Sequence, residues 1–438
     1  DYQEAALQDF LQRYFQLNHY GTNVRTELIA GVTTFLSMAY ITVVNPAILS
    51  DAGMDFGAVF VATCIAAAVG SLVMGIWANY PIAQAPGMGQ NAFFTYGVVL
   101  GLGHTWEAAL GAVFVSGIIF IILSVLPVRE WLINAIPKNL KLGISAGIGL
   151  FLGFIALKNA GVVVANPATL VSFGDMAAPG AIICLGGFAL IAALTARGVT
   201  GAVIIGMLVA TVLGLAVGAA EYQGVISAPP SLAPVLFKFD LMAVLDVSMV
   251  TVVLTMLLVD VFDTAGTLVG VSNRAGLTDS DGKLPRLGKA LLSDSTATVI
   301  GAVAGTSSTT SYIESAAGVE SGGRTGLVAV TVAGLFLLCL FFAPLAQTIP
   351  SFATSAALLF VACLMAKSLA ELDWEDLTES APSIVCAIGM PLSFSIADGI
   401  GLGFITYVAI KVMSGRAVEC PAAVYVIGAI FLGKFLFL

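Results

Sequence analysis

Four acidic residues lie inside long apolar runs of this sequence, where an ionisable side chain is costly and is therefore a candidate for function. Asp260 and Asp263 lie three residues apart in LLVDVFDTAGT, a spacing that puts both on one face of a helix. Asp294 lies in LLSDSTATVIG, and Glu314 lies in TSYIESAAG. We expect no intramembrane Lys or Arg to face them. A carboxyl group in such low-dielectric surroundings favours its protonated form, so these groups could load and release a proton.

The chemistry of these acids limits the kind of solute that they could hold. Several carboxylates without a cation would repel an anion and would suit a cation or a neutral planar solute with several N–H donors. Asn91, nearby Ser and Thr hydroxyls and backbone N–H groups at helix starts supply both donors and acceptors, which favours a heterocycle over a bare metal ion. A Na⁺ site of clustered oxygens is one alternative. For each acid and for Asn91, the other interpretation is a residue that caps a helix or packs.

The composition indicates the solvent around the elements that position these residues. Of the 438 residues, 59% are hydrophobic and only 10% are charged, against about 25% charged in an ordinary soluble domain. This excludes a soluble enzyme, a disordered scaffold and a nucleic-acid-binding protein, and the net charge of −9 argues against polyanionic partners. Two histidines, and six cysteines without metal-ligand spacing, argue against a catalytic triad or a metal centre. The sequence predicts a polytopic protein surrounded by membrane lipid.

The apolar runs fall into two sets of seven. The first set lies at about 28–50, 56–77, 79–94, 107–126, 139–160, 179–196 and 200–219. The second set lies at about 246–270, 286–305, 306–320, 326–346, 351–368, 382–395 and 398–415. The apolar tail 421–438 is either another crossing or an interfacial helix.

The distribution of basic residues predicts the orientation, because cytoplasmic loops carry an excess of Lys and Arg. With a cytoplasmic N terminus, only Lys158 and Lys238 fall in outside loops. The inside loops then contain Arg129, Lys138, Lys141, Arg197, Arg274, Lys283, Arg286, Lys289, Arg324, Lys367 and Arg416.

Seven is an odd number, so the second set must run antiparallel to the first, as in an inverted repeat. The third run of each set, 83–97 and 305–318, is too rich in Gly, Pro, Ser and Thr for a lipid-facing helix. Irregular backbone at membrane depth survives only where protein or water satisfies its polar groups. Interrupted segments in corresponding positions point to a transporter binding site. Two re-entrant loops without a ligand are the alternative.

Residues 1–27 lack the apolar core of a cleavable signal. Phe10, Tyr14 and Leu17 fall at helical spacing, which predicts a short helix on the membrane surface. A plain N-terminal extension is the alternative.

Five stretches form long and specific motifs: NVRTELIAGVTTFLSMAYITVVNPAIL (23–49), QAPGMGQNAFFTYG (84–97), VDVFDTAGTLVGV (259–271), LPRLGKALLSDS (284–295) and GTSSTTSYIESAAGVESGGRTGL (305–327). Together they resemble the AzgA-like purine permeases, a branch of the nucleobase:cation symporter-2 (nucleobase–ascorbate transporter) family. The resemblance extends from about residue 8 to the end of the fourteenth segment.

The resemblance implies an all-α polytopic fold with 14 transmembrane segments in a 7+7 inverted repeat. The core domain would comprise 28–130 and 246–346, and the gate domain 131–220 and 347–415. Residues 1–27 would be a cytoplasmic or interfacial segment, and 416–438 an apolar tail. Segments 3 and 10 would each pair a short strand with a half-helix. It also implies a homodimer, elevator-like movement of core against gate, and H⁺ as the coupling ion without other cofactors, with Na⁺ as an alternative.

Particular residues match the motifs of the family. Glu314 resembles the segment-10 residue that hydrogen-bonds the base, and Asp263 resembles the segment-8 acid that also holds it. Asp260 is a rival for that second role, one turn away. Asp294 matches a segment-9 Asp that is important for coupling or conformational change. Asn91 matches a polar residue beside the site.

Two residues next to Glu314 complete the predicted site. Backbone N–H groups around Ile313 and Ser315 are expected to meet the acceptors of the base. Ser315 stands where other branches carry Asn, which favours purines over uracil and leaves adenine, hypoxanthine and guanine open.

The expected function is therefore proton-coupled purine uptake across the plasma (inner) membrane, with Asp263, Glu314 and Asp294 in coupling. The alternatives are a transporter for uracil, xanthine or an anion, a passive channel, and an intramembrane aspartyl protease. The protease is disfavoured because the GxGD signature is missing and both Asp lie on one helix.

Overall fold

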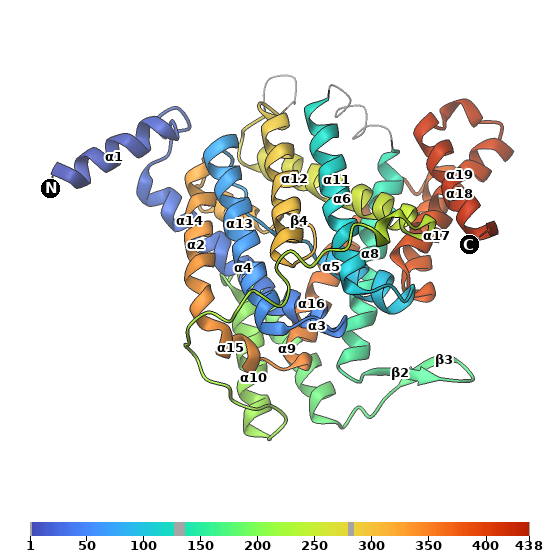
Figure 1. Cartoon of the computed structure of the whole chain (residues 1–438), viewed down its shortest axis with the longest axis horizontal. Helices are drawn as coiled ribbons and strands as arrows, with labels where there is room; N and C mark the ends of the chain where they lie inside the picture. The colour runs from blue at the N-terminus through green and yellow to red at the C-terminus, as the bar shows by residue number, and fades with distance from the viewer. Residues whose placement is uncertain (1, 127–135, 279–283, 438) are drawn as a thin grey trace.

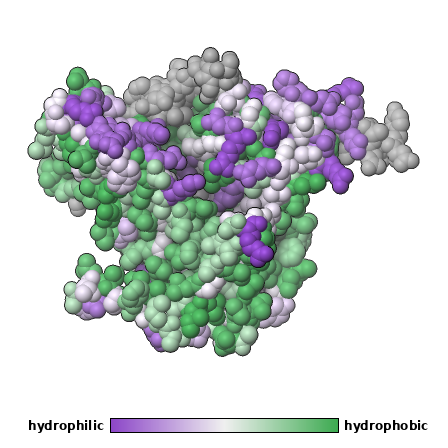
Figure 2. Space-filling view, turned by 180° about the vertical axis from the view of Figure 1, so that it is seen from behind, coloured by the Kyte–Doolittle hydropathy of each residue, from purple (hydrophilic) through white to green (hydrophobic). Residues whose placement is uncertain are grey.

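The structure, a computed structural model, describes residues 2–126, 136–278 and 284–437. Nine helices within these ranges are long and apolar enough to cross a membrane. Figure 2 shows hydrophilic residues gathered along the upper face and apolar residues over most of the flanks below. Large apolar side chains such as Ile122, Ile182 and Val250 stay exposed on these helices, as lipid contact requires. The predicted helical, polytopic membrane fold is confirmed, and the count of fourteen segments stays a prediction.

The first group of helices and strands runs to residue 216. It contains α1 (Tyr2–Tyr14), α2 (Val24–Met38), α3 (Ile41–Asp51), α4 (Phe56–Val73), η1 (Met74–Ala78), β1 (Gln84–Pro86), α5 (Met88–Ala92), η2 (Phe93–Gly101), α6 (Trp106–Val125), α8 (Lys138–Asn159), β2 (Val163–Asn166), β3 (Leu170–Phe173), α9 (Pro179–Ala196) and α10 (Ala202–Ala216). Arg129, Lys283 and the expected domain boundary at 130/131 lie outside the described residues.

The second group begins after a long connection. It contains η3 (Ala243–Leu245), α11 (Val247–Arg274), α12 (Leu287–Ala304), β4 (Thr309–Ser311), α13 (Ser315–Glu320), α14 (Gly326–Cys339), η4 (Leu340–Phe342), α15 (Ala343–Thr348), α16 (Ser351–Ala366), η5 (Lys367–Glu371), α17 (Leu377–Ser393), α18 (Ile396–Met413), η6 (Ala417–Glu419) and α19 (Ala422–Phe437).

The two interrupted segments meet in the interior. Strands β1 and β4 pair antiparallel, with Gln84 opposite Ser311 and Pro86 opposite Thr309. Each strand is followed by a short helix, α5 after β1 and α13 after β4. The pairing satisfies backbone groups that have no water to bond at this depth. Both segments therefore have the expected strand followed by a helix.

The surrounding helices pack in two neighbourhoods. Helices α4, α11 and α12 contact the strand pair, and α2 packs against α13 and α14. Helices α8, α16, α17 and α18 pack on one another. Figure 1 shows α2 and α14 at one side of the molecule and α17 to α19 at the other. The strand pair thus lies among the first neighbourhood and faces α8 of the second through α5.

The two ends of the chain are helical. Helix α1 projects from the body (Figure 1) and ends at Tyr14, whose hydroxyl donates to the carbonyl of Ile76 at 3.1 Å. Leu17 follows the helix and is buried against Leu327. At the other end, α19 packs on α18, and Lys434 in its last turn lies 2.6 Å from Asp398 in the first turn of α18. The apolar tail therefore runs back along α18.

Candidate functional site

The structure brings Asp263 and Glu314 together. Asp263 lies midway along α11, and Glu314 lies directly before α13. Both side chains are half-buried, and they are close enough to interact electrostatically. The hydroxyls of Thr264 and Thr310 are bonded at 2.7 Å, which ties α11 to β4 beside them. The two acids that the family resemblance assigns to contact with the base therefore lie next to each other.

A third residue, Tyr40, belongs to this site and was not predicted. The first apolar run is broken at 39–40, between α2 and α3. At the break, the fully buried Tyr40 donates its hydroxyl to Oε1 of Glu314 at 2.5 Å. A signal existed, since a tyrosine within a membrane span must find a partner for its hydroxyl. The sequence could not say which partner that is.

Asp260 is bonded to α12 and not to Glu314. It is fully buried, and its Oδ2 accepts a bond from the hydroxyl of Thr298 on α12 at 3.0 Å. The same hydroxyl lies 2.9 Å from the carbonyl of Thr309 in β4. Asp260 therefore connects α11 to α12 behind the strands, and whether Asp260 or Asp263 contacts the substrate stays a prediction.

Asp294 also lies behind the strands. Its Oδ1 accepts from the amide of Gln84 at 3.0 Å and from the hydroxyl of Ser311 at 2.9 Å. These donors belong to β1 and β4, so one carboxyl group of α12 holds both strands. Its second oxygen has no partner within the described part of the chain. Asp294 is thus bonded directly to the strand pair.

The polar residue of segment 3 is buried beside the loop that precedes β4. Asn91 accepts a hydrogen bond at Oδ1 from the hydroxyl of Ser307, while its Nδ2 has no acceptor among the described residues. Asn91 therefore joins the two interrupted segments and keeps one donor free.

The two residues that flank Glu314, Ile313 and Ser315, differ in whether their backbone N–H groups are already hydrogen-bonded within the protein. The N–H of Ser315 donates to the carbonyl of Tyr312 at 3.1 Å, and its hydroxyl accepts from the N–H of Ala83 at 3.0 Å. Both groups hold the loop, so the expectation that the Ser315 N–H meets a ligand is corrected. Ile313 is half exposed, and its N–H donates to no protein acceptor within the ranges that the structure describes.

A lysine lies near the helix segment that carries Asp263, whereas the sequence predicted that no Lys or Arg would face the acids. The amino group of Lys141, at the start of α8, is 5.6 Å from the ring centroid of Phe262, the residue before Asp263. In the described ranges, no group of three or more His, Cys, Asp or Glu residues could hold a metal ion.

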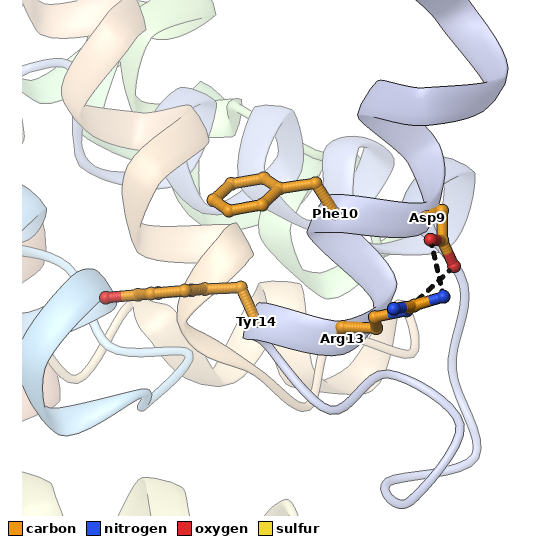
Figure 3. Close-up of a pocket in the computed structure, with 4 residues that line it drawn as sticks. All are labelled: Asp9, Phe10, Arg13 and Tyr14. Atoms are coloured by element: carbon orange, nitrogen blue, oxygen red, sulfur yellow. Dashed lines mark hydrogen bonds and ion pairs between the residues drawn. The ribbon is translucent and has the colours of Figure 1, made fainter.

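A surface hollow of about 410 Å³ lies apart from these residues, on α1 (Figure 3). It is lined by Asp9, Phe10, Arg13 and Tyr14. Asp9 and Arg13 form an exposed ion pair at 2.8 Å, and the rings of Phe10 and Tyr14 stack 5.7 Å apart. These contacts are worth a few tenths of a kcal/mol, about 0.3–0.5 for the ion pair. The hollow is a feature of the helix surface and holds none of the predicted site residues.

Comparison with known proteins places the chain in a family. A sequence profile described as the Permease family matches residues 25–402. The chain belongs to this family. Adenine permease AdeP of Escherichia coli (strain K12) is 48% identical over 435 residues, which cover 99% of this chain and 98% of that protein. Guanine/hypoxanthine permease PbuO of Bacillus subtilis (strain 168) is 45% identical over 425 residues, covering 95% and 98%.

A solved structure shares the fold. The transmembrane domain of the cyanobacterial bicarbonate transporter BicA superposes with a TM-score of 0.65 at 16% identity, covering 86% of this chain and 97% of that one. The resemblance to purine permeases that the motifs indicated is confirmed by the relatives. The chain is a transporter and not an enzyme, which removes the aspartyl protease alternative.

Proposed function

We propose that this permease imports purine nucleobases across the plasma membrane together with protons. The observation that carries the proposal is the meeting of Asp263 and Glu314 beside the paired strands. Relatives named for adenine and for guanine and hypoxanthine, each matching nearly the whole chain, support a purine as the substrate. The N terminus is cytoplasmic, and the chain forms fourteen segments in a 7+7 inverted repeat.

The half-buried carboxylates accept N–H groups of the base. Carboxylates are acceptors when ionised, and a purine presents several N–H donors along its edges. The free N–H of Ile313 and the free Nδ2 of Asn91 donate to ring nitrogens or a carbonyl oxygen. Because the N–H of Ser315 is already bonded, it is left out of these contacts.

Proton coupling uses Asp263, Glu314 and Asp294. A proton on one of the two site acids relieves their mutual repulsion when the base enters from outside. Asp294 takes part through the strands that it holds. The core, formed by the neighbourhood of α2, α4, α11 and α12, then shifts against the gate and opens the site to the cytoplasm. The protein acts as a homodimer.

Uptake of radiolabelled adenine, hypoxanthine and guanine, in cells without their own purine permeases, tests this proposal. Glu314→Gln removes the titratable carboxylate and is expected to lower uptake at least tenfold at unchanged membrane expression. Glu320→Gln is the matched control: this glutamate lies on the same short helix but is exposed and paired with Arg274 at 2.9 Å, a contact worth about 0–1 kcal/mol. Equal uptake by both variants would contradict the site.

The coupling ion is tested separately. A protonophore is expected to abolish accumulation, whereas replacing Na⁺ by a large organic cation is expected to leave it unchanged. If accumulation depends on the Na⁺ gradient instead, Na⁺ replaces the proton as the coupling ion in the proposal. If the internal concentration of the base never exceeds the external concentration, the protein acts as a channel.

A further inference from the structure

Tyr40 makes a contact that no part of the proposed transport cycle has used. Its hydroxyl donates to Oε1 of Glu314 at 2.5 Å, across 274 residues of sequence. Building on the proposed function, we propose that Tyr40 is a positioning residue that sets how many N–H groups of a purine Glu314 can accept. It thereby keeps guanine from gaining affinity over hypoxanthine through its additional 2-amino group.

The position of Tyr40 is fixed by the fold. The residue is 1% exposed and lies where α2 ends and α3 begins, among the buried side chains of Met38, Ile41 and Val44. Helix α2 also packs directly against α13, the helix that follows Glu314. The hydroxyl and the carboxylate therefore lie next to the ends of two helices that are in contact, and this packing holds them close to each other.

The bond changes what Glu314 offers to a ligand. A carboxylate with both oxygens free accepts two parallel N–H groups, as it does from an arginine. Here Oε1 already accepts a short bond from Tyr40, and no other side chain within the described residues donates to the carboxylate. Glu314 is therefore held to present mainly Oε2, in one orientation.

Two purines differ in this respect by a single group. Hypoxanthine has one N–H on its six-membered ring, at N1. Guanine has the same N–H with the 2-amino group beside it, which makes two parallel donors. A carboxylate that presents one oxygen binds only one of these two donors. Without the bond from Tyr40, both oxygens of Glu314 are available, and guanine can bind through both donors.

The test compares the two bases in Tyr40→Phe, which keeps the ring and removes the hydroxyl. KM for hypoxanthine is expected to rise because the carboxylate loses its fixed orientation. KM for guanine is expected to stay about the same, because a second hydrogen bond from its 2-amino group compensates for that loss. The ratio of kcat/KM for guanine to that for hypoxanthine is expected to increase about tenfold, the effect of one hydrogen bond to a charged group. Tyr407→Phe is the matched control, since Tyr407 is also buried and donates to a glutamate, Glu379, at 2.8 Å, but on α17 and α18. It is expected to leave the ratio unchanged.

Three results separate the possibilities. An equal change for both bases in Tyr40→Phe, or no change for either, would overturn the role of Tyr40 while leaving purine transport intact. Failure of the unmodified protein to transport any purine would instead overturn the proposed function. If Tyr40→Phe does not reach the membrane, competition in the unmodified protein decides: guanine and hypoxanthine should inhibit within about threefold of each other, and tenfold tighter binding of guanine would refute the inference.

Discussion

Gly318 controls the distance between the helix that follows Glu314 and the helix that leads to Tyr40. It lies on α13, and a Cβ at this position would be 2.6 Å from the carbonyl oxygen of Ala30 and 2.1 Å from Oγ1 of Thr34, both on α2. The threonine hydroxyl can rotate away. The carbonyl belongs to helix backbone and cannot, so Gly318→Ala must move one helix.

The size of the effect follows from that contact. Ordinary van der Waals contact begins at 3.4 Å, so α13 has to retreat from α2 by about 0.8 Å. Overpacking of this kind costs about 1–3 kcal/mol of stability. The shift also carries Glu314 away from Tyr40, and a misplacement of about 1 Å can cost about 10²-fold in activity. We therefore expect purine uptake to fall at least tenfold in protein that still folds.

The assay pairs uptake with thermal unfolding of the purified protein in detergent. Gly334→Ala serves as the control, because it lies on α14 with no heavy atom within 4 Å of the added Cβ. This variant should keep full uptake and gain up to about 1 kcal/mol from higher helix propensity. If Gly318→Ala matched Gly334→Ala in both uptake and Tm, the close packing of α13 on α2 could not be what positions Glu314.

Three further predictions concern carboxylates. Glu27 is fully buried and accepts three bonds at the start of α14, so Glu27→Ala should lower stability by about 2–4 kcal/mol, seen as a reduced Tm. The Thr378 hydroxyl and the Arg416 guanidinium lower the pKa of Asp376 to about 2 from 3.8; the Tm advantage over Asp376→Asn should be complete above about pH 4 and disappear towards pH 2, and a constant difference would refute it. Asp294→Asn keeps an acceptor oxygen but loses the titratable group, so folded protein should show uptake that no longer responds to a protonophore.

The interrupted segments were predictable because their cause is local. Backbone rich in Gly, Pro, Ser and Thr cannot face lipid, so 83–97 and 305–318 had to lie inside the protein. The structure places β1 and β4 there, paired with each other. The break in the first segment was not predictable in the same way, since neither Gly nor Pro stands at residues 39–40. It is found at 39–40, six residues before Pro46, which lies within α3.

The contacts at the site depended on residues that are distant in sequence. Composition alone identified Asp263, Asp260, Asp294 and Glu314 as acids in the membrane. It could not order them, because Asp260 and Asp263 share a helical face and differ only in what lies opposite: α12 for the first, the Glu314 loop for the second.

The sequence by itself determined that this chain crosses a membrane, that two of its segments are interrupted, and that four acids lie within its apolar runs, since these follow from hydropathy and from backbone that must bond internally. Only the tertiary structure decided that Glu314 is held by Tyr40, that Ser315 is already bonded, and that Asp294 joins the two strands. The reason is physical: a hydrogen bond depends on position to a few tenths of an ångström, and the packing of helices from opposite ends of the chain sets that position.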